Sequence, residues 1–303
     1  MDAMDLHRLD VFCKVVELKS FTKAAEAVFL SQPTISEHIR SLEESVGERL
    51  IDRLGREVLP TEAGKLLYSY ARKILRLRDE AVQALDNYSG RLAGHLYIGA
   101  STIPGTYILP KYIGAFKKIH GETEITLNIS NSRKVTENVL HGVTEFGLIG
   151  ASWNEPTLTW TEFFSDELVL VVYPEHPFAK LAAVKPQQLE GEPMIFRERD
   201  SGTRRVTNEI LEKHLDLSQL RIVAEMGSTE AVRQSIKAQI GISILSRLAV
   251  EDDLQHGTLK VVPLQGMRLT RPLFMVNRKN RPFSPICAAF VDFLNQGVNG
   301  NHG

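Results

Sequence analysis

The chain has 303 residues, a length that usually corresponds to about two folded domains. Its composition, 43% hydrophobic and 24% charged, is that of an ordinary globular protein and excludes intrinsic disorder, collagen-like repeats and mucin-like stalks. The formal net charge of -1 gives no overall attraction to nucleic acid, so any binding of DNA must come from local geometry.

The N-terminus and the cysteines indicate a cytoplasmic protein. Asp2, Asp5 and His7 stand where a secretory signal would need a basic and then an apolar stretch, and no apolar run reaches the roughly 18–20 residues that span a bilayer. Cys13 and Cys287 form no CxxC pair, and the nine histidines are scattered. We therefore expect no membrane anchor, no disulfide, no metal site and no cofactor.

The first thirty residues predict two helices in close contact. Between Leu6 and Leu18, apolar residues recur at helical spacing with charged residues on the other face, which is typical of an amphipathic helix. Ser20 is a good N-cap for a second, short helix rich in small residues, and Phe29-Leu30 follows as a turn.

A third helix is predicted after the turn, with Ser31 as its N-cap and Ile35, Ile39 and Leu42 spaced to face the core. The residues that then point outward are Gln32, Thr34, Ser36, Glu37, His38 and Arg40. Small hydroxyls and an amide at the start of such a helix can approach base edges in a major groove, and the helix end favours phosphate. From spacing alone, a three-helix bundle with a solvated polar face explains the pattern equally well.

Residues 50–61 consist of two short apolar stretches around Gly55 and predict a small β-hairpin, or wing. Three segments together closely resemble the LysR-type transcriptional regulators: Ser20 to Ala25, Ser31 to Ser36, and Leu59 to Gly64. The resemblance implies that residues 1–61 form a winged helix-turn-helix. Ile51 stands where the family commonly has Phe, a core substitution that leaves this assignment intact.

The same resemblance implies specific contacts with double-stranded promoter DNA. Arg53 and Arg56 would touch phosphates from the wing, and Gln32, Pro33, Thr34 and Ser36 would lie in the recognition helix. The full set of predicted DNA-binding residues is Ser31, Gln32, Pro33, Thr34, Ser36, Glu37, His38, Arg40, Arg53 and Arg56.

Residues 62–90 predict a long linker helix that forms a dimer. Thr61 caps it, and apolar residues recur at alternating steps of three and four for about three heptads, which favours a partner helix over packing onto the chain's own domain. The seam consists of Leu67, Tyr70, Ile74, Leu77, Ala81, Ala84 and Tyr88. The resemblance implies a homodimer that places two DNA-binding domains on an interrupted palindrome, and it favours a homotetramer.

After a break at residues 89–94, strands alternate with helical stretches to the C-terminus. Residues 96–100, 125–129 and 146–149 predict strands with helices between them, and a similar order recurs from Glu167. This βα repetition predicts a mostly parallel sheet, and the overall class is α/β with two lobes. We place lobe I at about residues 91–163 and 268–303, and lobe II at about 164–267.

Three strand ends carry small hydroxylated residues or glycine, where ligands of open α/β sheets bind. Such ends present hydroxyls and free N–H groups to an anion, although each one alone is more simply a cap or a turn. The predicted effector residues are Ser101, Thr102, Gly150, Ala151, Ser152, Ser201, Gly202 and Thr203.

Residues 91–303 also resemble the family's effector domain, which is similar to periplasmic solute-binding proteins. Ser101-Thr102 and Ser201 to Arg204 match its pocket loops, and Leu140 to Glu145 matches a Leu-x-x-Gly-x-x-Asp stretch with Glu145 in place of Asp. The resemblance implies a small-molecule effector between the lobes, and we expect it to be anionic. The resemblance also points to regulation of sulfur or selenium metabolism. It further implies RNA polymerase as a protein partner.

Three other classes of protein fit the sequence less well. An enzyme is disfavoured because GxGxxG, GxxxxGK[ST], HExxH and GxSxG are all absent from the sequence. A free-standing solute-binding protein would not carry the N-terminal helices and would need a signal peptide. A thiol-based peroxide sensor would need a cysteine pair within one domain, which Cys13 and Cys287 do not provide.

Overall fold

The computed structural model describes residues 5–54, 57–88 and 94–300. The chain divides into two compact units, residues 1–91 and residues 92–303, here called unit 1 and unit 2. Among the described residues, no helix is long and apolar enough to cross a membrane.

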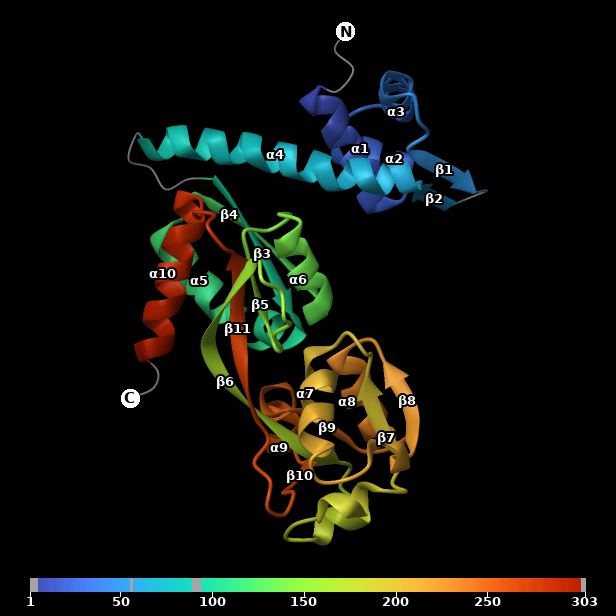
Figure 1. The fold of residues 1–303 in the computed structure, drawn as a ribbon, viewed down its shortest axis with the longest axis vertical. Helices are drawn as coiled ribbons and strands as arrows, with labels where there is room; N and C mark the ends of the chain where they lie inside the picture. The colour runs from blue at the N-terminus through green and yellow to red at the C-terminus, as the bar shows by residue number, and fades with distance from the viewer. Residues whose placement is uncertain (1–4, 55–56, 89–93, 301–303) are drawn as a thin grey trace. The chain divides into compact units, whose positions relative to one another are not determined.

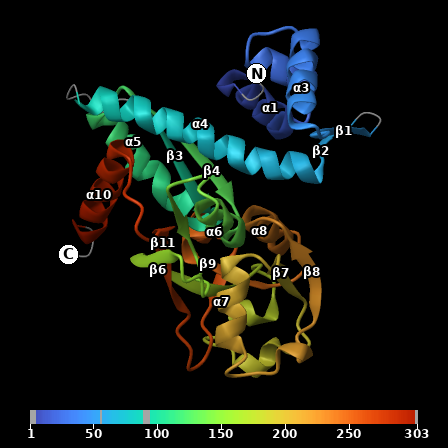
Figure 2. The ribbon, with the colours of Figure 1, turned by 45° about the horizontal axis from the view of Figure 1, so that its top comes forward.

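Unit 1 is a helix-turn-helix with a hairpin wing (Figures 1 and 2). Its elements are α1 (Leu6–Leu18), α2 (Phe21–Ala27), α3 (Gln32–Val46), β1 (Ile51–Leu54), β2 (Glu57–Pro60) and α4 (Glu62–Tyr88). The first three helices begin at side-chain caps, because Asp5, Ser20 and Ser31 each accept a hydrogen bond from a backbone N–H of the first turn. Their apolar faces close one core that includes Phe12, Ile35, Ile39 and Leu42, as the spacing predicts.

Lobe I of unit 2 contains β3 (Gly94–Ser101), the π-helical turn η1 (Pro104–Ile108), α5 (Leu109–Ile119), β4 (Thr123–Ser130), α6 (Ser132–Leu140), β5 (Phe146–Ile149) and α10 (Pro285–Gly300). Strand β3 runs parallel to β4 and to β5. The largest hydrophobic core of the unit lies here, where residues of β3, α5 and α10 pack together.

Lobe II contains β7 (Met194–Arg197), α7 (Gly202–Leu211), β8 (Ile222–Met226), α8 (Thr229–Lys237), β9 (Ser243–Ser246), α9 (Glu251–Gln255) and β10 (Lys260–Val262). Four short 3-10 turns complete it: η2 (Pro177–Lys180), η3 (Pro186–Leu189), η4 (Leu217–Gln219) and η5 (Arg247–Ala249). Its two cores lie on opposite faces of β6 (Leu158–Val172), with Leu168, Leu170 and Val172 in one and Val169 and Val171 in the other.

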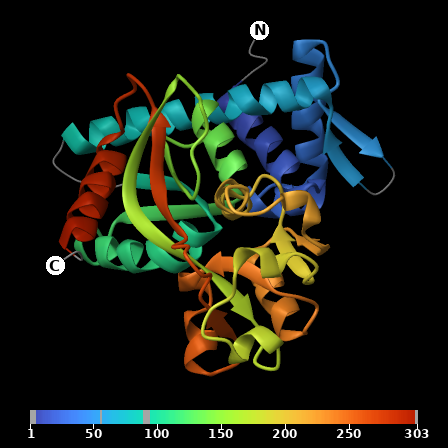
Figure 3. The same ribbon diagram turned by 60° about the horizontal axis from the view of Figure 1, so that its bottom comes forward.

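Two long strands connect the lobes (Figures 1 and 3). Strand β6 pairs with β11 (Thr270–Arg278) in lobe I and with β9 and β10 in lobe II, always antiparallel. The sheet order is β10-β6-β11-β5-β3-β4, with β9 also on β6. The prediction of a mostly parallel sheet is therefore wrong for these strands, because β11 returns from lobe II and must run against its neighbours.

Candidate functional sites

The outer face of α3 is polar and neutral at its start. Ser31 Oγ accepts from the N–H of Thr34 at 3.3 Å and lies 2.7 Å from Thr34 Oγ1, while Gln32 Nε2 donates to Ser36 Oγ at 3.1 Å. These side chains bond to one another and remain on the surface together with Pro33. The arrangement presents hydroxyl and amide groups along one edge of the first helical turns, where they can exchange these local bonds for bonds to base edges.

The next turns of α3 carry balanced charge. Arg40 is paired with Glu37 at 2.8 Å and with Glu44 at 3.7 Å, and all three side chains are exposed. The ring of His38 lies 5.2 Å from that of His7 on α1, edge to face. Burial lowers the pKa of His38, and the charges of His7 and Arg8 lower it further. Near neutral pH this part of the helix therefore carries no excess positive charge.

The wing is an antiparallel hairpin in which Arg53 pairs with Val58. The side chain of Arg53 and the whole of Arg56 lie outside the described part of the chain. Their predicted phosphate contacts stay predictions.

Helix α4 packs onto its own unit through a face different from the predicted seam. Ala71 and Leu75 are buried in the core of unit 1, whereas Tyr70 and Leu77 are 55% and 62% exposed. Of the other seam residues, Leu67 packs partly against that core, Ile74 and Ala81 are exposed, and the side chains of Ala84 and Tyr88 lie outside the description. The single chain thus leaves most of the described seam uncovered.

In unit 2, the lobes enclose a small pocket. It is lined by Ser101, Thr102, Ile103, Asn131, Ser132, Gly150, Arg197, Ser201, Gly202, Thr203 and Arg271. The cavity of about 10 Å³ has room for about one water molecule. Six of the eight predicted effector residues therefore meet in one place, although they come from three strand ends far apart in sequence.

The lobes are in direct contact at this pocket. A Cβ added at Gly202, the first residue of α7, would lie 2.7 Å from Ser132 Oγ and 2.9 Å from the carbonyl carbon of Gly150. Only glycine fits such an approach. Ser132 begins α6, so the N-termini of two helices from different lobes face the same space.

Two buried arginines add charge to the lining. Arg197 binds both carboxylate oxygens of Glu198 at 2.8 Å and donates to Thr229 Oγ1 at 2.6 Å. Arg271 binds Asp166 through Nε and Nη2, at 2.9 and 2.8 Å. Burial lowers the pKa of Arg271, the charge of Asp166 opposes that shift, and the charge of Arg197 adds to it.

Two of the predicted effector residues, and most of the charged residues near Ser201 to Thr203, lie outside the pocket. Ala151 is buried but, like Ser152, does not line the pocket. Arg199, Asp200, Arg204 and Arg205 line a separate open groove of about 580 Å³ beside Trp153. Of the charged residues flanking the second-lobe loop, only Arg197 faces the pocket.

The predicted set lacks five residues that also line the pocket: Asn131, Ser132, Ile103, Arg197 and Arg271. The first two follow β4 directly, and the rule that picked out the other strand ends would have found them. Arg271 lies inside a strand and carried no such signal.

A thiol switch does not fit the described residues. Burial raises the pKa of Cys13 to about 12, so its thiol stays protonated and unreactive at neutral pH. Cys287 is buried in the core of lobe I, in the other unit.

Two family models match this chain. The model described as "Bacterial regulatory helix-turn-helix protein, lysR family" matches residues 6–65, and "LysR substrate binding domain" matches residues 89–299. The chain belongs to the LysR family of bacterial regulators. It is a transcriptional regulator and not an enzyme, with a helix-turn-helix and an effector-binding domain.

Relatives and solved structures agree with the family. A "Probable RuBisCO transcriptional regulator" of Cyanidioschyzon merolae is 32% identical over 298 residues, covering 97% of this chain and 97% of the relative. The crystal structure of the LysR family regulator CbnR has a TM-score of 0.72 at 22% identity, covering 97% of this chain and 99% of CbnR. The regulatory domain of Synechocystis CcmR in complex with 2-PG has a TM-score of 0.63 at 24% identity, covering 67% of this chain and 97% of that domain. At these identities, the two structures show a shared fold.

Proposed function

We propose that this LysR-type regulator binds an interrupted palindrome in promoter DNA through α3 and the wing, and responds to a small anionic metabolite held between the lobes. In this proposal residues 1–61 read DNA, residues 62–90 form the dimer through the α4 seam, and residues 91–303 bind the effector. The protein works in the cytoplasm as a dimer or a dimer of dimers.

The observation that carries the effector half is the convergence at the inter-lobe pocket. Hydroxyls of Ser101, Thr102 and Thr203, two helix N-termini and two buried guanidinium groups line one small space. Each of these groups can donate hydrogen bonds to an oxyanion. The uncovered seam of α4 supports the dimer, because soluble chains seldom leave such apolar stripes without a partner.

The comparisons favour one area of metabolism. The relative named above is a probable RuBisCO regulator, and the similar CcmR domain binds 2-PG. We therefore take 2-PG as the first candidate effector and genes of carbon assimilation as the first candidate targets. The named relatives give no support to the sulfur or selenium assignment.

A footprint tests the proposal directly. The protein is bound to the intergenic DNA upstream of its own gene, with and without 2-PG, sulfate or thiosulfate. We expect a protected interrupted palindrome whose length or bending changes with one anion. No protection at low salt, from folded dimeric protein, would refute the DNA-binding half.

Variants separate the two halves of the proposal. Arg53→Ala should weaken binding to all DNA sequences and reduce the slope of log affinity against log salt by about one. Thr34→Val should change base preference instead. Thr102→Val should abolish the effector response while DNA affinity stays intact.

A further inference from the structure

Among the described residues, the most deeply buried charged side chains lie at the junction of the lobes. Arg271 is 2% exposed and Asp166 is 1% exposed, and they face each other across the ladder that joins β11 to β6. Because β6 and β11 are the two strands that connect the lobes, this ion pair is part of the connection, and its Arg271 also lines the pocket.

Asp166 holds the Arg271 guanidinium in a fixed orientation. Its Oδ2 accepts a hydrogen bond from Nε of Arg271 and forms an ion pair with Nη2 at 2.8 Å, and its Oδ1 accepts from Ser246 Oγ at 2.7 Å. Both carboxylate oxygens are thus occupied, and Arg271 cannot turn away without leaving a buried carboxylate unpaired.

The other side of Arg271 reaches the pocket. Nη1 donates to Thr203 Oγ1 at 3.1 Å, and it packs so closely on the end of β5 that a Cβ at Gly150 would lie 2.9 Å from it. A guanidinium has more N–H donors than its bonds to Asp166 and Thr203 use. The N–H groups of Arg271 that these bonds leave unused therefore belong to a side chain that lines the cavity.

The start of α7 also lacks a side-chain cap. Ser201 makes no side-chain capping hydrogen bond, unlike Asn131 at α6 and Ser228 at α8. The N–H groups of the first turn of α7 therefore still need an acceptor, and Thr203 in that turn touches Arg271.

We propose that Arg271 anchors the anionic group of the effector, and that Asp166 and Ser246 are positioning residues that aim its guanidinium. The ligand class is a small organic acid whose carboxylate or phosphoryl group bonds to Arg271 and to the first turn of α7. Because the cavity of about 10 Å³ holds only about one water molecule, the lobes must separate to admit it. This inference rests on the proposed function, since it names a residue of the same pocket.

The carboxylate of Asp166 has opposite effects on the stability of the free protein and on anion binding. In the free protein its carboxylate compensates the charge of Arg271, and a bound anion shares that charge. Removing the negative charge of Asp166 should therefore weaken the free fold and strengthen anion binding. A purely structural ion pair would show only the first effect.

The experiment measures the stabilisation of the full chain by four probes: acetate, glycolate, inorganic phosphate and phosphoglycolate. Thermal unfolding at increasing probe concentration gives an apparent dissociation constant for each. The variants are Asp166→Asn, Arg271→Lys and the apolar pair Arg271→Met with Asp166→Leu, which leaves no buried charge unpaired. Arg278→Met, on the same strand but outside the pocket, is the matched control.

We expect at least one probe to stabilise the unaltered chain and the Arg278→Met control equally. Arg271→Lys should bind it about tenfold more weakly, because the planar fork is lost. The apolar pair should unfold cooperatively with no response to any probe, and Asp166→Asn should be less stable without the probe but bind it about tenfold more tightly. Stabilisation by acetate or glycolate would indicate a carboxylate ligand, and stabilisation by inorganic phosphate would indicate a phosphoryl ligand.

Three results would overturn the assignment. They are no stabilisation by any probe, an undiminished response in the apolar pair, or an Asp166→Asn variant with unchanged affinity. Binding of promoter DNA by the probe-free protein is measured in parallel. Loss of that activity would contradict the proposed function, whereas failure of the probe series alone contradicts only this inference.

Discussion

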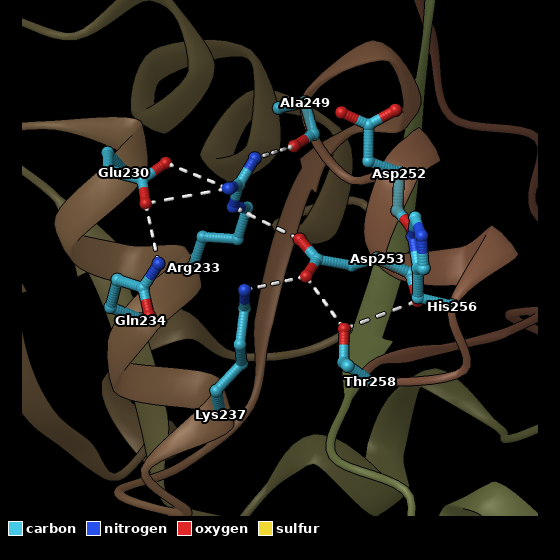
Figure 4. A network of polar contacts seen from close by, with 9 residues as sticks. All are labelled: Glu230, Arg233, Gln234, Lys237, Ala249, Asp252, Asp253, His256 and Thr258. Carbon is cyan, nitrogen blue, oxygen red and sulfur yellow. Dashed lines mark hydrogen bonds and ion pairs between the residues drawn. The ribbon is translucent and has the colours of Figure 1, made fainter.

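Lys237 and Asp253 form an ion pair of 2.6 Å that fastens α8 to α9 (Figure 4). The other oxygen of the same carboxylate lies 3.1 Å from Nε of Arg233, and Thr258 Oγ1 donates to Oδ1 at 2.7 Å. Arg233 also donates from Nη1 to the carbonyl of Ala249. One buried carboxylate thus organises the outer helices of lobe II.

The first prediction concerns this carboxylate. Asp253→Asn should lower the free energy of unfolding by about 3 kcal/mol, since it removes the buried carboxylate that Lys237 and Arg233 share and leaves Arg233 only its ion pair with Glu230. Urea unfolding at pH 7 measures the loss, and Asp252→Asn, at the exposed neighbouring position, should change little.

Acid should reproduce that loss. Burial alone would raise the pKa of Asp253, but hydrogen bonds from Lys237 and Thr258 and the charge of Arg233 outweigh it and lower the pKa below its ordinary 3.8. The unfolded chain then takes up this proton more readily than the folded one. The contribution of Asp253 is complete above pH 3.8 and is lost as the pH falls through the lower folded value. Equal slopes of stability against pH in the variant and the unaltered chain would contradict this.

The turn between α2 and α3 contains a strained residue. Phe29 adopts φ 56°, in the left-handed region, and its side chain is 95% exposed. A bulky residue there costs free energy and gains no packing in return. Phe29→Gly and Phe29→Asn should each stabilise unit 1 by about 1 kcal/mol. Phe29→Ala keeps the Cβ and lacks the short polar side chain that lets Asn adopt this region, so it should not stabilise the unit, and a gain as large in that variant would show that backbone strain is not the cause.

The contact between the lobes depends on the missing side chain of Gly202. Gly202→Ala should force the lobes apart, because the new Cβ meets the backbone of Gly150. We expect a lower melting temperature of unit 2 and a weaker response to the effector. Gly227→Ala, where an added Cβ has nothing within 4 Å, is the control and should melt within a degree or two of the unaltered chain.

His38 should make unit 1 less stable in mild acid. Its folded pKa lies below the ordinary 6.5, because burial and the charges of His7 and Arg8 disfavour the protonated ring. The unfolded chain therefore binds this proton first, and stability is lost as the pH falls below 6.5. An NMR titration of the His38 ring measures the pKa directly. A midpoint at or above 6.5 would contradict the prediction, and His38→Gln should remove the corresponding pH dependence of unfolding.

The local parts of the fold could be predicted from the sequence. Helix caps and apolar spacing act within one or two helical turns, so they can be recognised without knowledge of tertiary contacts. Examples are the caps Ser20 and Ser31 and the apolar residues Ile35, Ile39 and Leu42. The pocket residues Ser101 and Ser201 could be predicted for a similar reason, since ligands bind where the strands of an α/β sheet end.

The pairing of Arg271 with Asp166 could not be predicted in this way. The two residues are 105 positions apart, and they meet only because β11 returns between β5 and β6. A lone arginine and a lone aspartate inside strands give no periodic signal. The direction of β11 was missed for the same reason, because strand order is a long-range property.

The position of β11 also bears on synthesis. This strand fills the centre of the lobe I sheet, yet it lies beyond the whole of lobe II in the chain. While the ribosome is still making residues 173–269, the edges of β5 and β6 that later pair with β11 have no partner from that strand. Lobe II has all its strands by Val262, whereas lobe I must wait for Thr270–Arg278 and α10. During synthesis the effector domain thus has an open sheet edge, the kind of surface that aggregates or recruits chaperones, until β11 and α10 emerge.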